Sequence, residues 1–514
     1  MSIRTAAASG GERPHGDHLA ILSGTTQNIV GIGVAAAALF VVQILMTRAL
    51  GEEGYGVVTL LTQAAFVASF ATRSGMDMAV LRDVAVEVGV ARRDHVQVLV
   101  ARAALIALAV SGVVAIVIVA LGDSVLSLIG IEEDAGWLIP ATALGLPFIA
   151  VANVWLAATR GLKIMRYTLY VFWAGQNIVW IVLTLVLWQL ETSSTTSVLA
   201  YSLSWVWAAA AAWYFWRKES RAWPTTPPTP GWLEKLLRYA GPRAPAALFA
   251  QLLFWTDLFV LTRFARPADV GVYAAALRAG QIAMLFLTSV NLMFGPYVAD
   301  LHNRGERQRL DGLYKSLTRW IVAATLPVFL VIAVAPGDVM RIFGAEFARG
   351  ETALLILLAG QLVNIATGSA GFILIMVGRT GWDLIVYAGS LALDVALALW
   401  LCRRFGIEGA AVANAVTFAA SNCARLLLVR RFVGIQPYDR NYLRLAAPAC
   451  CALGAMWLAH QAIDAVYLAR LLVTAGVGAI VYVAAYALVG LTPAERRGAA
   501  TLLARFRSES SART

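Results

Sequence analysis

Apolar segments of about 20 residues recur along most of the chain, and this spacing constrains the fold more than any other feature. Of the 514 residues, 60% are hydrophobic and 14% are charged, whereas about 25% of the residues in a soluble domain are charged. A helix needs about 20 apolar residues to cross the hydrocarbon core of a bilayer. The sequence therefore predicts an all-α integral membrane protein.

Fourteen transmembrane helices are expected. We place them at about 24–47, 57–74, 98–121, 136–157, 168–190, 197–216, 243–264, 270–293, 317–335, 352–377, 384–402, 407–429, 443–463 and 467–489.

The distribution of charge predicts the orientation. The net charge is +11, and the basic residues fall mostly in alternate loops, as they do in membrane proteins whose cytosolic loops retain Lys and Arg. The loop from Gly122 to Ala135 has four acidic residues and no basic one, so it is expected outside. Both termini are then cytosolic, and the basic excess does not indicate nucleic acid as a partner.

An internal repeat predicts two similar lobes. Three dipeptides recur at a shift of 215 residues: Thr47-Arg48 and Thr262-Arg263, Gly56-Val57 and Gly271-Val272, and Gly122-Asp123 and Gly337-Asp338. A repeat with an even number of crossings implies a pseudo-two-fold axis along the membrane normal.

The expected division of the chain follows from this repeat and from a Pro/Thr-rich stretch near residue 225. It comprises a cytosolic tail (1–20), an N-lobe with helices one to six (21–216), a cytosolic linker (217–242), a C-lobe with helices seven to twelve (243–431), helices thirteen and fourteen (432–490) and a second cytosolic tail (491–514). A short amphipathic helix is expected at 232–239, lying on the inner leaflet.

The sequence argues against an enzyme. It has no GxxxxGK[ST] phosphate loop, no HExxH, and no Cys pair or His at metal-ligand spacing. The predicted outer loops are too short for a catalytic domain. We expect no cofactor and no metal site, so energy for transport would come from an ion gradient, the membrane potential or the substrate gradient.

Several segments resemble the polysaccharide-transport branch of the multidrug/oligosaccharidyl-lipid/polysaccharide (MOP) exporter superfamily. They are TRALGEEGYGVVTL from Thr47, SGMDMAVLRDVAV from Ser74, Asp257 followed by VGVYAAALR from Val270, and GIEGAAVANAV from Gly406. In that superfamily the drug exporters usually have twelve crossings and the lipid-linked sugar flippases fourteen. Asp394 stands where the family often has Asn in its eleventh helix.

The resemblance implies a flippase that moves a polyprenyl-diphosphate-linked oligosaccharide across the bacterial inner (cytoplasmic) membrane by alternating access. A peptidoglycan lipid-precursor flippase and a drug or metabolite cation antiporter of the same superfamily remain alternatives. The implied partners are the lipid-linked oligosaccharide and membrane lipid, with H⁺ or Na⁺ and polysaccharide polymerase or assembly proteins as further candidates.

Charged residues inside predicted helices are the first candidates for the site, because a charge at the middle of a membrane helix is costly and is usually paired or faces a cavity. They are Asp257, Arg278 and Asp394. Asp257 and Arg278 have similar predicted depths on consecutive helices, so we expect them to meet. Either a helix-packing salt bridge or a role in binding substrate fits that pair, and Asp394 fits either a hydrogen-bonded acid or an ion-coupling group.

Two further groups complete the candidates. Arg48 and Arg263 lie at the predicted outer ends of helices one and seven, where they fit either interfacial anchors or an outer gate that meets phosphate. Asn177, Gln281 and Asn291 could donate hydrogen bonds to sugar hydroxyls, although hydrogen bonding between helices explains them equally well.

Overall fold

The computed structural model describes residues 14–89, 93–122, 124, 136–226, 231–492 and 495, and within them every element is helical, as predicted. The first half of the chain forms α1 (Pro14–Thr72), α2 (Met76–Gly89), α3 (Val96–Ala120), α5 (Leu138–Gly161), α6 (Arg166–Thr168), the π-helix η1 (Leu169–Gly175), α7 (Gln176–Leu187), α8 (Ser194–Ser220) and α9 (Trp232–Leu252). The second half forms α10 (Thr256–Leu261), α11 (Pro267–Gln281), the 3₁₀ turn η2 (Ile282–Met284), α12 (Leu285–Asn303), α13 (Arg307–Val334), α14 (Pro336–Arg341), η3 (Glu346–Gly350), α15 (Glu351–Ala366), α16 (Ala370–Met376), α17 (Thr380–Phe432), η4 (Arg440–Leu445), α18 (Ala446–Ala462), α19 (Tyr467–Ala485) and η5 (Tyr486–Gly490).

The number of membrane-spanning helices agrees with the prediction only in part. Among the described residues, nine helices are long and apolar enough to cross a membrane. A tenth is added if the bent pair at 346–366 and 370–376, with an angle of 44°, is counted as one crossing. The chain is thus a multi-span membrane protein, and the count of fourteen stays a prediction.

Two long helices each hold a sharp kink at a glycine. Gly51 divides α1 and has φ 69°, and Gly406 divides α17 and has φ 54°. Positive φ costs a residue with a Cβ considerable strain, which glycine avoids. Each kink falls between two predicted crossings, and each of these long elements therefore comprises two helices that meet at the glycine.

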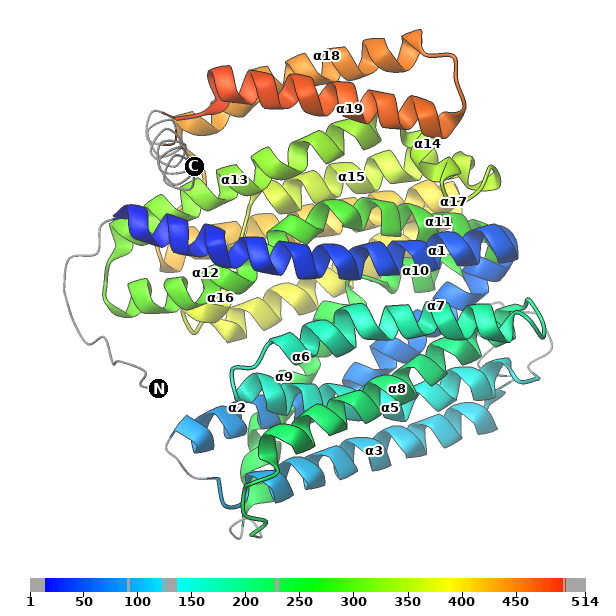
Figure 1. Ribbon diagram of the computed structural model, residues 1–514, viewed down its shortest axis with the longest axis vertical. Coiled ribbons are helices and arrows are strands. Elements are labelled where there is room, and N and C mark those ends of the chain that lie inside the picture. Colours follow the sequence, from blue (N-terminus) through cyan, green and yellow to red (C-terminus); the bar gives the residue numbers. More distant parts are fainter. Residues whose placement is uncertain are drawn as a thin grey trace, which may run out of the picture.

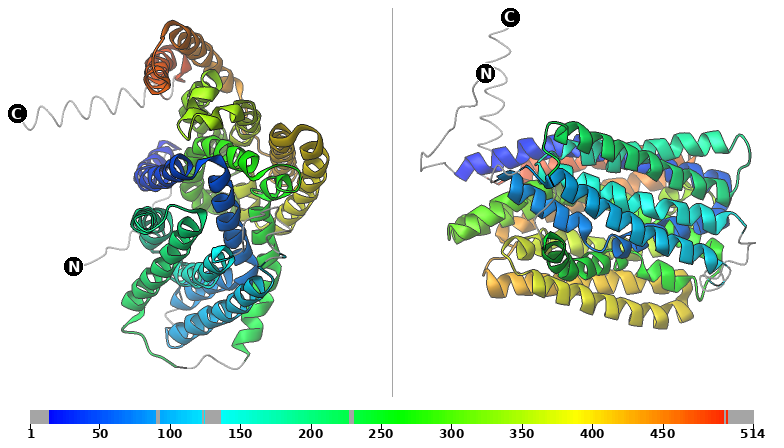
Figure 2. Two further views of the ribbon diagram at one scale, coloured as in Figure 1. Left: turned by 90° about the vertical axis from the view of Figure 1, so that its right-hand side faces the viewer. Right: turned by 90° about the horizontal axis from the view of Figure 1, so that it is seen from below.

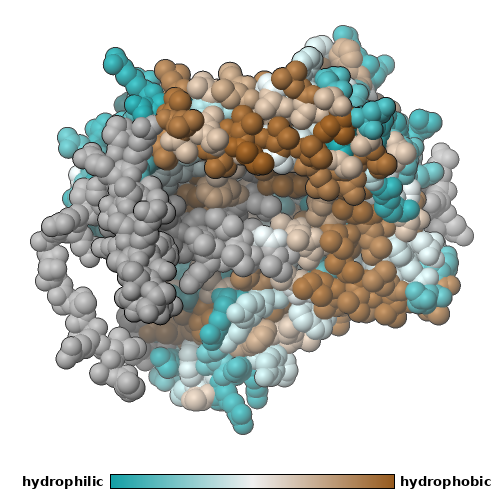
Figure 3. Space-filling model, turned by 45° about the horizontal axis from the view of Figure 1, so that its top comes forward, coloured by the Kyte–Doolittle hydropathy of each residue, from teal (hydrophilic) through white to brown (hydrophobic). Residues whose placement is uncertain are grey.

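The helices form two side-by-side groups (Figures 1 and 2). We call α2, α3, α5, α6, α7 and α8 the N-half, and α10 to α17 the C-half. Helix α1 contacts both halves, since it packs on α5 and α8 and also on α11 and α12. On the face seen in Figure 3, hydrophobic side chains form a band across the upper part and an area to the right of the middle, and hydrophilic ones gather at the margins, which is the surface expected of a protein in a bilayer.

The region of the predicted linker is more helical than expected. Helix α8 continues to Ser220, and α9 runs without a break from Trp232 to Leu252. The short amphipathic helix expected at 232–239 is therefore wrong as a separate element. Its residues form the first turns of a longer helix that packs on α1, α2 and α17.

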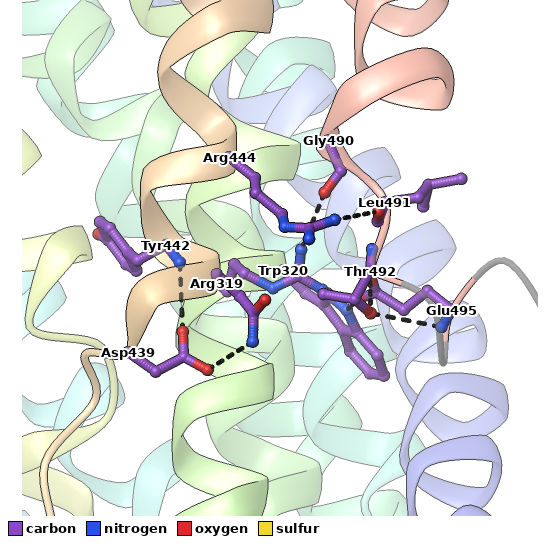
Figure 4. A network of polar contacts seen from close by, with 10 residues as sticks. Arg319, Trp320, Asp439, Tyr442, Arg444, Gly490, Leu491, Thr492 and Glu495 are labelled. Carbon is purple, nitrogen blue, oxygen red and sulfur yellow. Dashed lines mark hydrogen bonds and ion pairs between the residues drawn. The ribbon is translucent and has the colours of Figure 1, made fainter.

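Helices α18 and α19 pack against each other and against α13 at the edge of the C-half (Figure 1). At one end, Glu495 accepts hydrogen bonds from the amide of Thr492 (2.8 Å) and from the indole of Trp320, and pairs with Arg319. Arg444 donates to the carbonyl of Leu491 at 3.1 Å (Figure 4). These contacts fix the end of η5 against α13.

At the other end, Asp338 of α14 receives three basic side chains. Arg470 donates to both carboxylate oxygens, with Nε at 2.7 Å from Oδ2, while His460 lies 3.1 Å and Arg341 3.3 Å away. Burial by itself would raise the pKa of the Asp338 carboxyl, but the hydrogen bonds from Arg470 and His460 hold that pKa below its usual range. A lowered pKa means that the carboxylate stabilises the docked helices at neutral pH, and that this contribution is lost as the pH falls through the lowered pKa.

Arg470→Ala is expected to loosen α19 from α14. It removes two charge-assisted hydrogen bonds from a carboxylate that is 3% exposed, and hydrogen bonds to charged groups contribute about 1.5–3 kcal/mol. Thermal unfolding in detergent at pH 7 should show a lower midpoint than the wild type, whereas Arg403→Ala, at an exposed position of α17, should not. Equal midpoints for both variants would contradict a stabilising role.

Candidate functional site

Arg278 lies near the end of α11, where the C-half faces α1 and α8. Its guanidinium lies over the indole of Trp255, 4.7 Å from the ring centroid, and Nη1 donates to Oε1 of Gln281 at 3.4 Å. Its Nε is buried without an acceptor. Within the part of the chain that the structure describes, no carboxylate pairs with Arg278, so its positive charge is left without a counter-ion.

The remaining neighbours of Arg278 are aromatic. It interacts electrostatically with Tyr55 of α1 and Tyr201 of α8, and the Tyr55 hydroxyl is oriented by donating to Oε1 of Gln43 at 2.8 Å. A cation between aromatic rings and hydroxyl groups suits an anionic group that is attached to a sugar. The arginine can donate to the anion, and the rings can pack on the sugar.

Asp257 lies in α10 and is fully buried. Its carboxylate accepts hydrogen bonds from the amide of Leu258 at 2.9 Å, from Nδ2 of Asn414 at 2.9 Å and from the hydroxyl of Tyr273. With three donors, this carboxylate needs no cationic side chain beside it.

The expected pairing of Asp257 with Arg278 is wrong: among the described residues the two form no ion pair. The reason is the geometry of α11. Tyr273, which donates to Asp257, and Arg278 are five positions apart, and at about 100° per residue they lie about 140° apart around the helix. Asp257 therefore meets one side of α11 and Arg278 extends from the other.

Asp394 of α17 is, like Asp257, fully buried. Neither of its carboxylate oxygens has a hydrogen-bond partner. Asp394 interacts electrostatically with Asp257, and the Thr417 hydroxyl lies beside it but outside hydrogen-bonding geometry. A buried carboxylate without donors is stable only if it is protonated or meets a cation.

The kink at Gly406 brings these groups together, because Asp394 lies before it on α17 and Asn414 and Thr417 lie after it. Two carboxylates with an amide and a hydroxyl form a set of oxygen donors, which suits a proton or a small hard cation such as Na⁺. In the described residues no three His, Cys, Asp or Glu side chains cluster as a metal site. We call Asp257, Asp394, Asn414 and Thr417 the acidic cluster.

The other predicted residues do not join either group. Arg48 is exposed and donates to the carbonyls of Arg341 (2.7 Å) and Ile342 (3.1 Å) and to the Tyr467 hydroxyl (2.7 Å). Arg263 is exposed.

Asn177 donates within its own helix region, to the Trp173 carbonyl at 2.7 Å. The side chain of Asn291 lies outside the described residues. Of the predicted residues, the structure thus brings together Arg278 with Gln281, and Asp257 with Asp394.

Residues from distant segments complete these groups through contacts that the sequence did not predict. Tyr273 and Asn414 bind Asp257, and Tyr55 and Tyr201 approach Arg278. Asn414 lies in the GIEGAAVANAV segment, so the motif was visible in the sequence, although its contact with Asp257, 157 positions away, was not.

Helix α1 meets the C-half closely at the end that the sequence predicts to face outward. A Cβ on Gly271 of α11 would lie 1.9 Å from the carbonyl oxygen of Glu52, and one on Gly56 of α1 would lie 2.3 Å from that of Pro267. Arg349 of η3 bridges the same place by pairing with Glu52 at 2.9 Å and with Asp269. We call this contact the outer closure.

Gly271→Ala is expected to open the outer closure, because a methyl group cannot fit against a backbone carbonyl and the helices must separate. A single cysteine at Thr59, which is 3% exposed, would report the change in a background without the native cysteines. It should react faster with an impermeant maleimide added from outside. Gly112→Ala in α3, where a Cβ meets nothing within 4 Å, should leave the labelling rate unchanged, and an unchanged rate in Gly271→Ala would contradict the expectation.

Comparison with solved structures supports the fold. The chain is similar to an inward-facing MATE family multidrug transporter of the MOP superfamily, with a TM-score of 0.65 and 15% identity over 79% of this chain and 94% of that chain. It is also similar to the lipid II flippase MurJ in an inward closed conformation, with a TM-score of 0.69 and 12% identity over 90% of this chain and 98% of that chain. At these identities the likeness establishes the fold alone.

Comparison of sequences gives the family. The chain is 28% identical over 183 residues to the "Probable low-salt glycan biosynthesis flippase Agl15" of Haloferax volcanii, a match that covers 35% of this chain and 39% of the relative. The sequence model of the polysaccharide biosynthesis protein family matches residues 21–302, which is more than half of the chain. The predicted resemblance is therefore confirmed, and the chain belongs to the polysaccharide biosynthesis protein family.

Proposed function

We propose that this protein is a flippase that moves a polyprenyl-diphosphate-linked oligosaccharide from the cytosolic to the outer leaflet of the bacterial cytoplasmic membrane, with both termini in the cytosol. The observation that carries the proposal is Arg278, a cation without a counter-ion among aromatic side chains where the two halves face each other. A diphosphate supplies the missing negative charge, and its attached sugars can pack on Trp255, Tyr55 and Tyr201.

The charge of Arg278 also favours some of the alternative substrates over others. A cationic drug in the same space would meet a like charge without screening by water, which costs affinity. A peptidoglycan lipid precursor has the same diphosphate chemistry, so it stays as the alternative substrate. The similarity to a glycan biosynthesis flippase favours the oligosaccharide.

The proposed transport cycle alternates access to the space around Arg278. Gly56 and Gly271 are related by the internal repeat and contact each other directly, as residues beside a pseudo-two-fold axis would. Opening of the outer closure, with the two halves tilting relative to each other on either side of this axis, would expose the head group to the outside. The lipid tail would remain in the bilayer throughout.

The acidic cluster is the proposed site of energy coupling. A proton or Na⁺ entering from outside would neutralise Asp394 and change the packing of the two arms of α17 around Gly406. Since Asn414 joins one of these arms to Asp257 on α10, and α11 packs on α10, binding of the cation can influence the helix that carries Arg278.

Reconstituted vesicles can test the function. The protein is placed in liposomes with a labelled polyprenyl-diphosphate oligosaccharide in both leaflets, and the fraction of glycan open to an impermeant glycosidase is followed over time. A flippase makes all of the glycan accessible, whereas vesicles with an inactive protein stop near one half. If vesicles with folded protein also stop near one half under H⁺ and Na⁺ gradients, the proposal is wrong.

A further inference from the structure

A groove on the N-half lies outside the groups described above. Its volume is about 560 Å³, within the roughly 300–1,000 Å³ typical of ligand sites. Its lining is contributed by the first three turns of α3, the second half of α5 and the last half of α8. Small residues such as Ala101 and Ala210 leave the space, and larger ones such as Phe148, Trp155 and Trp213 wall it.

The length of the groove matches one leaflet of a bilayer. Its lining on α3 runs from Gln97 to Leu108, and eleven steps at about 1.5 Å each give roughly 16 Å. The hydrocarbon core of a bilayer is about 30 Å thick. The groove therefore begins at the predicted cytosolic surface and ends near the middle of the membrane.

Polar side chains gather only at the cytosolic end of the groove, where Gln97, Arg217 and Ser220 line it. Gln97 already donates to the carbonyls of Ser220 and Trp223. Arg217 is exposed and forms no ion pair with any described residue. Its neighbour Glu219 extends from another side of α8, where it accepts from the Tyr167 hydroxyl.

More basic side chains lie around the same end of the N-half. Arg93 lies over Trp223 (5.2 Å) and Arg102 over Trp232 (5.5 Å). Lys218 belongs to the same last turn of α8 as Arg217. An apolar groove one leaflet long, with basic residues and tryptophans at its cytosolic mouth, has the chemistry of a phospholipid site with an anionic head group.

The position of the groove argues against the tail of the transported lipid as its occupant. Helix α3 packs on α1, α2 and α5 and lies at the edge of the molecule farthest from the C-half in Figure 1. Arg278, where the head group is proposed to bind, lies between the halves. A lipid bound at Arg278 would have to pass its tail around α5 and α8 to reach the groove.

We infer that the groove between α3, α5 and α8 binds an anionic phospholipid of the inner leaflet, with one acyl chain in the groove and its phosphate at Arg217. The inference does not depend on the proposed transport activity. Because the groove connects α3 with α8, and Tyr201 of α8 approaches Arg278, a bound lipid also stabilises the helix that forms one wall of the space between the halves.

Native mass spectrometry of the full chain tests this site with phosphatidylglycerol and phosphatidylcholine of identical acyl chains. The wild type should bind one phosphatidylglycerol about five-fold or more tightly than phosphatidylcholine, since one basic residue near an anionic lipid contributes about that factor. Arg217→Ala should abolish the preference. Arg430→Ala, an exposed residue at the predicted cytosolic end of α17, is the matched control and should keep it.

The Ala210→Phe variant distinguishes lipid binding in the groove from lipid binding by surface charge alone. The position is exposed, so the larger side chain fills the groove without entering the packed core, and a monodisperse elution profile would verify the fold. Loss of the tightly bound phosphatidylglycerol in Ala210→Phe supports the site. If either Ala210→Phe or Arg217→Ala retains the tightly bound phosphatidylglycerol, the inference is wrong. It is also wrong if undecaprenyl phosphate displaces phosphatidylglycerol from the wild type and the Arg278→Ala variant still binds undecaprenyl phosphate, because the groove would then hold the transported carrier lipid.

Discussion

Arg278→Ala is expected to reduce transport of the lipid-linked oligosaccharide by at least about 30-fold while leaving a folded protein. Removing one partner of a desolvated charge pair typically costs about 2–5 kcal/mol, and the proposed partner is the diphosphate. The protein itself should tolerate the change, because Arg278 has no carboxylate partner in the described chain and its removal leaves no buried anion behind. The vesicle assay measures the rate, and size-exclusion chromatography measures the fold.

Two variants control this experiment. Arg278→Lys keeps the charge but cannot form two parallel hydrogen bonds with a phosphate, so it should retain part of the activity. Arg263→Ala removes an exposed arginine near the start of the same segment and should transport at the wild-type rate. Normal transport by Arg278→Ala at wild-type protein levels would remove the main support for the proposed function.

Asp394→Asn is expected to uncouple transport from the ion gradient. The carboxylate is fully buried and has no hydrogen-bond donor, so it is the group of the acidic cluster most in need of a proton or cation. An amide has nearly the same shape but no charge. In vesicles, an imposed H⁺ or Na⁺ gradient should stimulate transport by the wild type but not by this variant. If the gradient drives the cycle, the transport rate of the variant under the gradient should be lower by about ten-fold or more.

The neighbouring acid should respond differently. Asp257→Ala leaves the Tyr273 hydroxyl and the Asn414 amide without their buried acceptor, and each unsatisfied group costs about 1–3 kcal/mol. This variant should therefore lose stability as well as coupling. Asp300→Asn, at an exposed position of α12, should alter neither, and an unchanged stimulation in Asp394→Asn would contradict the coupling site.

Much of the fold was accessible from the sequence because a bilayer leaves few choices. Backbone N–H and C=O groups in hydrocarbon must hydrogen-bond to each other, so long apolar segments become helices. The ends of these helices are predicted where charged residues flank the apolar segments. The same reasoning identified Arg278, Asp257 and Asp394 as unusual, since a charge inside such a segment needs a specific explanation. The resemblance of short segments to one exporter branch was also sufficient to find the family.

The partners of those charges were decided only by the tertiary structure. The similar predicted depths of Asp257 and Arg278 in the membrane suggested that the two side chains meet. Depth does not determine which side of a helix a residue occupies, however. Tyr273 rather than Arg278 lies on the side of α11 that meets Asp257. Arg48 was expected to be either an interfacial anchor or part of an outer gate, and its side chain binds the carbonyls of Arg341 and Ile342. The sequence alone thus determines which residues are costly to bury, whereas helix rotation and contacts between distant segments determine what those residues meet.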